Sequence, residues 1–519
     1  MRNQFAMLNP SIKKIETGID GLDFITDGGL PEGRTTLVAG SAGSAKTILA
    51  AQYLANAVRQ HDEAVVFVTF EESPADIRRN VASFGWPVAK WEADGKWAFV
   101  DGTIDPENGS IEHGGYDFGA LAARIEYAVR RVGATRLSVD SLGAVFSQFE
   151  DRATVRREMQ RIAQALGRMG VTSLLTAERT DEYGEISRLG VEEFVADNVI
   201  VLRHVLENEK RRRTIEILKL RGTTHSRGEF SFTVDAVAGI VVMPLAASDL
   251  SQRSSSQRVT SGNDKLDEIS GGGYFRDSII LVSGATGTGK TLLATEFIAG
   301  GARAGERCLL LGFEESRDQV TRNAAGWGKP YEEFEREGLL RAECEYPESR
   351  SLEDQLVRIK SLIDEFEPQR VAIDSLSALE RTGSVKSFRE FVLGVTSYIK
   401  EKEIPGLFTA STSALMGGSS ITEQHISTIT DTIILLRYVE MLGEVMRGMT
   451  VLKMRGSPHS KQIFSFSVDD GGMTIGRPFR RVGGILSGNV THLPEAESDR
   501  LERLFDDPDL PGPQGAPAQ

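Results

Sequence analysis

Short apolar runs alternate with amphipathic, helix-like stretches along most of the chain. Apolar runs of strand length cover residues 35–39, 64–70, 136–139, 278–282, 308–313 and 370–373. Near-continuous apolar strands separated by helical patterns are typical of a parallel sheet covered by helices on both faces. The pattern therefore predicts an α/β fold built on mostly parallel sheets.

The second half of the chain repeats the first. The stretch Phe70–Ser73 recurs as Phe313–Ser316, and three other matched pairs keep a constant separation of 234 positions: Asp140 with Asp374, Asp197 with Asp431, and Lys219 with Lys453. Copies of about 240 residues are too long for solenoid repeats and match whole domains. We predict domains at 1–246 and 261–488, joined by a polar linker at 247–260 and followed by a partly disordered tail at 489–519.

A phosphate-binding loop is predicted in the second copy. Gly284–Thr291 matches the pattern G-x-x-x-x-G-K-[ST], after an apolar run and before the helical pattern 292–298. Its glycines let backbone N–H groups turn toward phosphate oxygens at a helix N-terminus, the lysine reaches the β- and γ-phosphates, and the last hydroxyl binds Mg²⁺. The predicted ATP-binding residues are Thr286, Gly287, Thr288, Gly289, Lys290 and Thr291.

The first copy carries an altered version of this loop. Its predicted binding residues are Gly43, Ser44, Ala45, Lys46 and Thr47. Ala45 stands where the pattern has its second glycine, so the loop is strained if that position needs a positive φ and little affected if it does not. Because Lys46 and Thr47 are retained, we predict a working but altered site.

Acidic residues follow two of the apolar runs in each copy. The pairs Glu71–Glu72 and Glu314–Glu315 end the second run, where they can deprotonate or orient a nucleophile beside a triphosphate. The alternative is a solvated pair at a helix start, which the following Ser-Pro in the first copy favours. Asp140 and Asp374 end the third run, as a carboxylate associated with Mg²⁺ would.

A basic element also recurs. Lys219-Leu220-Arg221-Gly222, with His225, is matched by Lys453-Met454-Arg455-Gly456, with His459. Alternation along a strand would place lysine and arginine on the same side, about 7 Å apart, as a clamp for phosphate charge. A solvated sheet edge is the alternative.

Composition excludes several classes of protein. A hydrophobic fraction of 40% and a charged fraction of 26% are those of a folded globular chain. The net charge of −14 argues against general binding to nucleic acid or anionic membrane, although Lys210–Arg213 is basic. No run reaches the about 18 apolar residues of a membrane helix, and no secretion signature is evident, so a cytoplasmic location is expected. Cys308 and Cys344 are expected to be ordinary buried thiols.

The copies differ just before the shared aspartate. Ser427 and Thr428 precede Asp431, whereas the first copy has Glu193 and Phe194 at those positions. The second copy thus offers hydroxyl groups that the first does not. They could accept a phosphoryl group, or they could carry no function, because serine and threonine are common.

These features together resemble the KaiC family of circadian clock ATPases and autokinases. The resemblance rests on the doubled phosphate loop, on Phe-Glu-Glu-Ser in both halves, on Lys-Leu-Arg-Gly-Thr, and on the segment from His425 to Glu440. It extends over about residues 15–488. It implies two tandem RecA-like P-loop domains that assemble as a homohexamer of two stacked rings, with ATP and Mg²⁺ at the subunit interfaces.

For the first ring, the resemblance implies slow ATP hydrolysis. Glu71 would be the general base and Glu72 its companion, while Thr47 would hold Mg²⁺; Asp140 is added to the metal site by its place at the end of the third run. Further nucleotide contacts, several of them from the neighbouring subunit, would be Ser83, Lys219, Leu220, Arg221, Thr223 and His225.

For the second ring, it implies a reversible autokinase. Glu314 would be the base and a Mg²⁺ partner with Thr291; the sequence pattern itself adds Asp374 to the metal site and Glu315 to the acidic pair. The nucleotide would be lined by Trp327, Arg447, Lys453, Met454, Arg455 and His459. Ser427 and Thr428 would be phosphorylated across the interface, with Arg381 as a pairing arginine.

The resemblance also bears on partners. A KaiB-like protein is a plausible partner of the first ring. Residues 489–519 do not match the family's tail, on which KaiA docks in cyanobacterial systems, so dependence on KaiA is not expected. Two other functions remain open: a RecA-like DNA-dependent recombination ATPase, which needs basic DNA-binding loops, and a non-catalytic scaffold in which ATP only joins subunits.

Overall fold

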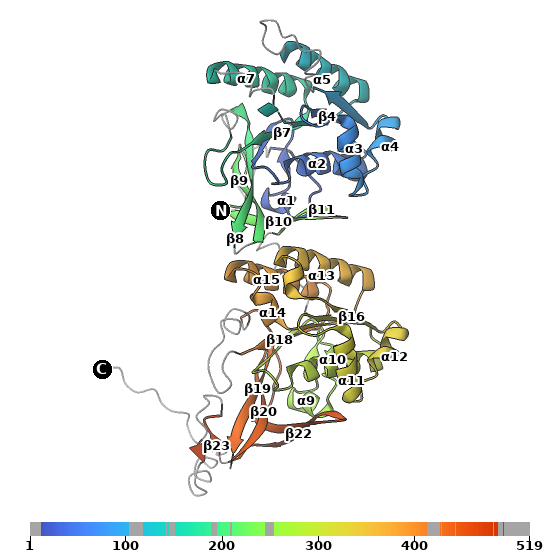
Figure 1. Ribbon diagram of the computed structural model, residues 1–519, viewed down its shortest axis with the longest axis vertical. Coiled ribbons are helices and arrows are strands. Elements are labelled where there is room, and N and C mark those ends of the chain that lie inside the picture. Colours follow the sequence, from blue (N-terminus) through green and yellow to red (C-terminus); the bar gives the residue numbers. More distant parts are fainter. Residues whose placement is uncertain are drawn as a thin grey trace, which may run out of the picture. The chain divides into compact units, whose positions relative to one another are not determined.

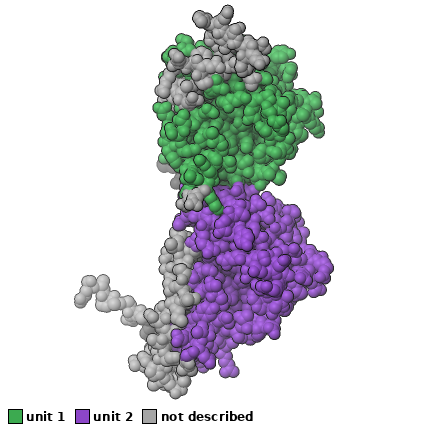
Figure 2. All heavy atoms as spheres, in the orientation of Figure 1, with its two compact units in different colours: residues 1–248 green, residues 249–519 purple. Residues whose placement is uncertain are grey.

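The computed structural model contains two compact units, residues 1–248 and 249–519 (Figure 2). The structure describes residues 12–102, 118–141, 143–144, 151–187, 195–207, 210–243, 254–412, 426, 428–441, 443–480, 482–485 and 491–492. The boundary between the units falls inside the predicted linker 247–260. The end of that linker, Arg258–Val259, is strand β12, which pairs with β13 (Tyr274–Phe275).

The first unit is built on a nine-stranded sheet with the order β11-β10-β9-β8-β3-β7-β6-β4-β5. Its strands are β3 (Thr35–Gly40), β4 (Val65–Thr69), β5 (Trp97–Asp101), β6 (Arg136–Asp140), β7 (Thr172–Glu178), β8 (Asn198–Glu207), β9 (Lys210–Leu220), β10 (Glu229–Asp235) and β11 (Gly239–Met243). Strands β3 to β8 are parallel, and β9 to β11 continue the sheet in antiparallel fashion. A short pair, β1 (Lys14–Ile15) with β2 (Leu30–Pro31), stands apart from this sheet.

Helices cover both faces of this sheet (Figure 1). The described helices are α1 (Leu22–Ile25), α2 (Lys46–His61), α3 (Pro74–Ala82), α4 (Val88–Ala93), α5 (Phe118–Val132) and α7 (Arg152–Met169). Alternate residues of β4 face opposite layers: Val65 and Phe67 pack in the core with α2, and Val66 and Val68 in the core with α5 and α7. This alternation explains why the apolar runs are continuous.

The second unit repeats this architecture, with the strand order β16-β15-β17-β18-β14-β19-β20-β21-β22. Its strands are β14 (Ile279–Gly284), β15 (Cys308–Gly312), β16 (Leu340–Cys344), β17 (Arg370–Asp374), β18 (Gly406–Ser411), β19 (Thr432–Met441), β20 (Glu444–Met454), β21 (Phe464–Asp469) and β22 (Gly472–Pro478). Its helices are α9 (Asp264–Ile269), α10 (Lys290–Arg303), α11 (Arg317–Gly326), α12 (Tyr331–Arg336), α13 (Leu352–Phe366), α14 (Leu376–Glu380) and α15 (Val385–Glu401).

The predicted α/β fold with two mostly parallel sheets is confirmed. The six apolar runs are β3, β4, β6, β14, β15 and β17, with ends that differ by one or two residues. In the predicted tail, β24 (Thr491–His492) pairs with β23 (Val482–Gly483), and the rest lies outside the described residues. Both cysteines are free; Cys308 is buried as predicted, whereas Cys344 is only half-buried.

A buried arginine connects the opening segment of the second unit to its sheet. Arg370, at the start of β17, pairs with Glu306, and its Nη1 donates to the carbonyl oxygens of Thr260 (2.7 Å) and Phe297 (3.1 Å). The first unit repeats this contact with Arg136 and Glu63. Because such a guanidinium is desolvated, its partners must remain in place to compensate for its charge.

We expect Arg370→Met to destabilise the second unit by about 3 kcal/mol, because Glu306 would lose one of its two arginine partners inside the protein. Thermal unfolding should show a transition lowered by roughly 6–12 °C. The control is Arg307→Met, which removes an exposed pair with Glu367 and should cost about 0–1 kcal/mol. Equal effects of the two substitutions would contradict the argument.

Candidate functional site

Both predicted phosphate loops join a central strand to a helix at the carboxyl edge of the sheet. In the first unit, β3 ends at Gly40 and α2 begins at Lys46. The Lys46 ammonium donates to the carbonyl oxygens of Gly40 (2.9 Å) and Ser41 (3.0 Å), and the Ser44 hydroxyl also donates to Ser41 (2.7 Å). The loop thus curls around its own lysine at a helix N-terminus, an arrangement suited to phosphate.

The second loop has the same geometry between β14 and α10. Lys290 and the Thr288 hydroxyl both donate to the Ala285 carbonyl oxygen, at 2.9 and 2.7 Å. Gly289 caps α10 with φ of 104°, and Ala45 caps α2 with φ of 71°. The position does require a positive φ, so Ala45 holds the first loop in a conformation that costs an alanine about 1–2 kcal/mol.

Carboxylates converge on the lysine of the first loop. Glu71 follows β4 and Asp140 ends β6, and both interact electrostatically with Lys46, as do Glu178 and Glu182. Burial lowers the pKa of Lys46, and these acids oppose that effect. The predicted base, nucleotide lysine and Asp140 are therefore brought together.

Glu71 is held in a particular way. The Ser141 hydroxyl donates to Glu71 Oε1, and Thr176 donates to Asp140. Desolvation raises the pKa of Glu71, the Ser141 hydrogen bond opposes this, and Asp140 and Glu178 add to the rise. A carboxylate with a raised pKa beside a phosphate loop is suited to accept a proton from water. Glu72 points elsewhere, accepting a hydrogen bond from Asn80 Nδ2 (2.8 Å).

The second unit arranges the same positions differently. Glu314 pairs with Arg381 at 3.7 Å, an exposed contact. The hydroxyl of Ser375, the counterpart of Ser141, is buried without a hydrogen-bond partner in the part of the chain that the structure describes. Glu315 accepts a hydrogen bond from Asn323 Nδ2 (3.1 Å), and burial raises its pKa. Lys290 interacts with Asp374 and Glu314.

Sequence analysis missed several residues of the first site. Ser41 donates to Glu182 Oε1 (2.6 Å), and Arg213 Nε donates to the Gly43 carbonyl oxygen (3.2 Å). Glu178 could have been found because it ends β7, as Asp140 ends β6. Ser141 carried no such signal, since a serine after a strand is common.

The recurrent basic element lies at the opposite edge of the sheet from the phosphate loop, meaning the edge where the parallel strands begin. Leu220 pairs with Asn198, which pairs with Thr36 at the start of β3, whereas the phosphate loop follows the end of β3. The prediction that Lys219 and Arg221 share a strand is wrong, because β9 ends at Leu220 and Arg221 lies in a turn. Both side chains contact the segment before β8: Lys219 donates to the Ala196 carbonyl oxygen (2.7 Å), and Arg221 pairs with Asp197 (3.4 Å).

The second unit places its hydroxyl segment at that same edge. Lys453 donates to the Thr430 carbonyl oxygen (2.7 Å), and Arg455 Nη2 donates to that of Thr428 (2.9 Å). Thr428 is exposed. Ser427 lies outside the described residues. The distance along β14 from this edge to the phosphate loop is five residue steps, roughly 16 Å.

The other predicted nucleotide contacts are scattered. Arg447 pairs in register with Tyr438, and the Tyr438 hydroxyl donates to the Thr286 carbonyl oxygen (3.3 Å). The backbone of Arg447 therefore lies near the second phosphate loop. Ser83 and Trp327 each cap the C-terminus of a helix after the acidic pair. Met454 is buried at the end of β20, while Thr223, His225 and His459 are half-buried beyond the basic turns.

The residues present fit a magnesium ion bound together with a nucleotide. Thr47 lies in the first turn of α2, and Asp140 ends the strand beside β4, both at the edge that carries the loop. Within the described ranges, no group of three or more His, Cys, Asp or Glu side chains is placed to hold a metal by itself. Among the same residues, no helix has the length and apolar character needed to cross a membrane.

Comparison with known proteins bears on this site. The family model described as "ATPase: KaiC" matches residues 15–247 and 259–479, one match for each unit. The chain is 59% identical to the circadian clock protein KaiC3 of Synechocystis sp., over 96% of this chain and 98% of that protein. It is 53% identical to the circadian clock oscillator protein KaiC of Thermosynechococcus vestitus (95% of each chain) and 51% identical to that of Synechococcus elongatus (97% of each).

We expect Ser141→Ala to shift the acid limb of nucleotide hydrolysis to higher pH. As the predicted base, Glu71 must be deprotonated to accept a proton, and burial already raises its pKa above the ordinary 4.5. Removing a hydrogen bond that lowers this pKa raises it further, so hydrolysis fails at a higher pH as the solution is acidified. At neutral pH the rate should fall by about tenfold or less, because Glu71 loses its orientation.

The measurement is the hydrolysis rate between pH 4 and 8, and Ser375→Ala is the matched control. The Ser375 hydroxyl has no partner within the described residues, so its removal should leave the pH profile unchanged. An acid limb in Ser141→Ala that coincides with that of the wild type would contradict the role assigned to this hydrogen bond.

Reciprocal substitutions test the cap position of the two loops. Gly289→Ala should weaken the second loop by about 1–2 kcal/mol, because alanine at φ of 104° is strained and its Cβ would approach Met473 Cε to 3.3 Å. Ala45→Gly should relax the first loop and change its hydrolysis rate, with a stability gain reduced by the greater freedom of glycine in the unfolded chain. Thermal unfolding with and without ATP, and hydrolysis rates, measure both. Opposite signs are expected, and equal signs would contradict the strain argument.

Proposed function

The chain belongs to the KaiC family of ATPases, and from this premise we propose that it is a clock-type ATPase whose second unit phosphorylates Ser427 and Thr428 of a neighbouring copy. The observation that supports this proposal most strongly is the separation, within one chain, of the phosphate loop from the segment that carries Thr428. ATP hydrolysis by the first unit and phosphoryl transfer by the second would be the two activities.

The first unit has what hydrolysis needs. Lys46 and the loop amides would hold the phosphates, and Glu71 would take a proton from water as its oxygen attacks the γ-phosphorus. Thr47 and Asp140 would hold Mg²⁺, which supplies charge neutralisation at the phosphates when bound. The raised pKa of Glu71 and its hydrogen bond from Ser141 suit a base.

The second unit has what transfer needs, except that the parts lie at opposite edges. The hydroxyl oxygen of Thr428 would form a bond to the γ-phosphorus, the bond to the β-γ bridging oxygen would break, ADP would leave, and the hydroxyl proton would pass to Glu314. A hydroxyl at the edge where β14 begins cannot do this with a loop at the other end of that strand, roughly 16 Å along it, within one chain. The loop of one copy must therefore meet the opposite edge of the next.

This head-to-tail contact leads to rings. An interface between two different faces of identical subunits closes into a ring when the rotation permits. We propose six copies, and two stacked rings because the chain carries two such units. Lys453 and Arg455 would then lie near the neighbour's nucleotide, as would Lys219 and Arg221 in the first ring. A KaiB-like partner of the first ring is part of this proposal.

A DNA-dependent ATPase is less well supported. The only strongly basic run, Lys210–Arg213, forms the start of β9. Arg211 donates to the His204 carbonyl oxygen, Arg212 pairs with Glu207, and Arg213 reaches the phosphate loop. These side chains are engaged within the unit rather than presented together for phosphate backbone.

The test is intact-mass spectrometry of the purified protein after incubation with ATP and Mg²⁺. Wild type should gain up to two phosphates per chain, and the double substitution Ser427→Ala with Thr428→Ala should gain none. Glu71→Gln should lower ATP hydrolysis at least a hundredfold in the first unit while leaving phosphorylation in place, and Glu314→Gln should do the reverse.

Hexamers assembled from two different variants test whether the phosphoryl group passes between copies. Subunits with Lys290→Ala, which lack a working second loop, should be phosphorylated when assembled with subunits that carry Ser427→Ala and Thr428→Ala. In this mixture, Lys290→Ala chains that stay unphosphorylated while the wild type gains phosphate would refute transfer between copies. A wild type that gains no phosphate would refute the kinase proposal itself.

A further inference from the structure

We propose that Lys400 is a positioning residue for the phosphoacceptor Thr428, acting through Asp431 and Arg455. This inference rests on the proposed function of the second unit and adds a residue that no motif of the chain contains. It is carried by an ion pair, by a chain of contacts from that pair to Thr428, and by the absence of an equivalent side chain in the first unit's helix.

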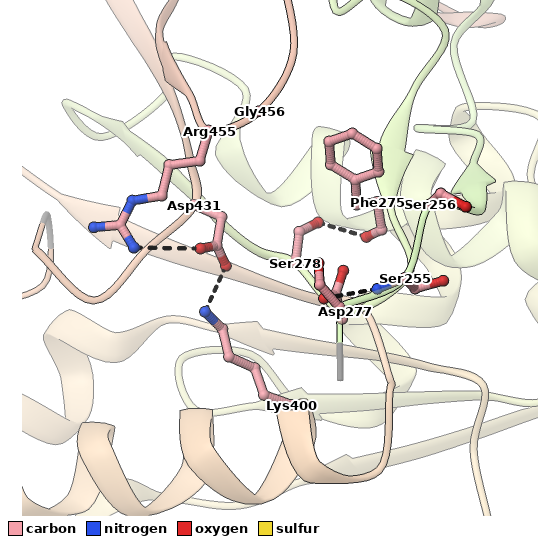
Figure 3. Close-up of a pocket in the computed structure, with 10 residues that line it drawn as sticks. Ser255, Ser256, Phe275, Asp277, Ser278, Lys400, Asp431, Arg455 and Gly456 are labelled. Carbon is pink, nitrogen blue, oxygen red and sulfur yellow. Dashed lines mark hydrogen bonds and ion pairs between the residues drawn. The ribbon is translucent and has the colours of Figure 1, made fainter. Parts of the chain in front are cut away.

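The ion pair lies on the wall of a pocket of about 580 Å³ (Figure 3). Lys400 is in the last turn of α15, and its ammonium contacts Asp431 Oδ2 at 2.8 Å. The side chains are 22% and 18% exposed, so the contact is shielded from most of the solvent. A pair this short and this protected constrains both groups more than a surface pair does.

Asp431 is fixed at the start of the central strands. Its Oδ2 also accepts a hydrogen bond from the Ile279 amide (2.9 Å), and its own amide donates to the Ile279 carbonyl oxygen (2.9 Å). Ile279 begins β14, the strand that ends at the phosphate loop. The carboxylate is thus a rigid reference point on the sheet.

Arg455 connects Asp431 to Thr428. Its Nη1 is 3.6 Å from Asp431 Oδ1, while its Nη2 donates to the Thr428 carbonyl oxygen at 2.9 Å. Thr428 lies in a turn in which the amides of Ile429 and Thr430 donate to Ile426. Ile426 and Thr430 are buried and Thr428 is exposed, so Arg455 holds the exposed part of an otherwise anchored turn.

The first unit has no such lysine. Counting back from the residue with positive φ that follows each helix, Gly170 and Glu403, the counterpart of Lys400 is Gly167. The preceding residues, Leu166 and Ile399, are both buried, which supports this alignment. A Cβ added at Gly167 would meet nothing within 4 Å, so no neighbouring atom takes the place of the start of the Lys400 side chain. The first unit also has Phe194 in place of Thr428.

Charge balance gives Lys400 its role. Asp431 carries one negative charge among three cations: Lys400 at 2.8 Å, Arg455 at 3.6 Å, and Lys453, which interacts with it electrostatically. Because Lys400 satisfies the carboxylate at close range, Arg455 can direct its stronger hydrogen bond to the Thr428 carbonyl. Without Lys400, Asp431 would lose its shortest ion pair and attract Arg455 more strongly, and the guanidinium would move toward it and away from Thr428.

The test substitution is Lys400→Met in the full chain. Methionine keeps the length and apolar stem, and the pocket wall leaves room for it. The initial rate of Thr428 phosphorylation should fall about three- to tenfold, with a smaller effect on Ser427, so that the ratio of the two products changes. Site-resolved mass spectrometry after ATP addition measures both. Lys400→Arg should restore the rate and the ratio.

The matched control is Lys402→Met. Lys402 follows the same helix and forms an equally short pair with Asp364 at 2.7 Å, but both side chains are about half exposed and neither contacts Asp431. It should leave both phosphorylation rates unchanged. ATP hydrolysis by the first unit should be the same in all these variants, which excludes general misfolding or failure to assemble.

The outcomes separate the two proposals. A wild type that is phosphorylated, together with Lys400→Met showing the same rate and product ratio, overturns this inference alone. Equal losses in Lys400→Met and Lys402→Met also overturn it, because the effect would then be one of helix charge. A wild type that gains no phosphate overturns the proposed function and this inference with it.

Discussion

The polarity of the parallel strands is the constraint on which the rest of the structure depends. Every strand from β14 to β19 points the same way, so the phosphate loop can form only where β14 ends, and the turn with Thr428 only where β19 begins. Paired strands are stiff, and the two edges are held about 16 Å apart. In the proposed transfer, the edge with the phosphate loop is the donor and the edge with Thr428 the acceptor; because the two cannot meet within one chain, the proposal requires an intermolecular contact.

Duplication gave two copies of this frame, which differ in the charges around it. In the first unit Ser141 donates a hydrogen bond to Glu71, and Glu178 at the end of β7 adds to the carboxylates near the lysine. In the second unit Glu314 pairs with Arg381, and Ser411 ends the strand that corresponds to β7. Nearby negative charge raises the pKa of a carboxylate, which makes it a stronger base for taking a proton from water. A carboxylate that is paired and more exposed leaves room for a protein hydroxyl. The same scaffold can in this way favour the proposed ATP hydrolysis in one unit and the proposed phosphoryl transfer in the other.

The edge of the second unit that carries Thr428 is an electrostatic assembly with a net positive charge. Lys400, Asp431 and Arg455 share their charges around the turn that carries Thr428. A phosphate there would add about −1.5 to −2 charge next to this set and compete with Asp431 for the same two cations. Asp431 is hydrogen-bonded to Ile279 at the start of β14, so a shift of Asp431 caused by a phosphate at the turn can move the strand that carries the nucleotide loop.

The sequence by itself determined the features that depend on local spacing: the phosphate loops, the acidic pairs, the strand-end aspartates, the duplication and the parallel sheets. These features can be recognised in a sequence because backbone geometry keeps neighbouring residues close together. The family resemblance added the roles of Ser427 and Thr428. Only the tertiary structure decided that Ala45 has a positive φ, that the basic element lies opposite the phosphate loop, and that Ser141 and Lys400 each contact a carboxylate distant in the chain. Single residues that meet across a sheet leave no periodic trace in a sequence, since their partnership is created by folding alone.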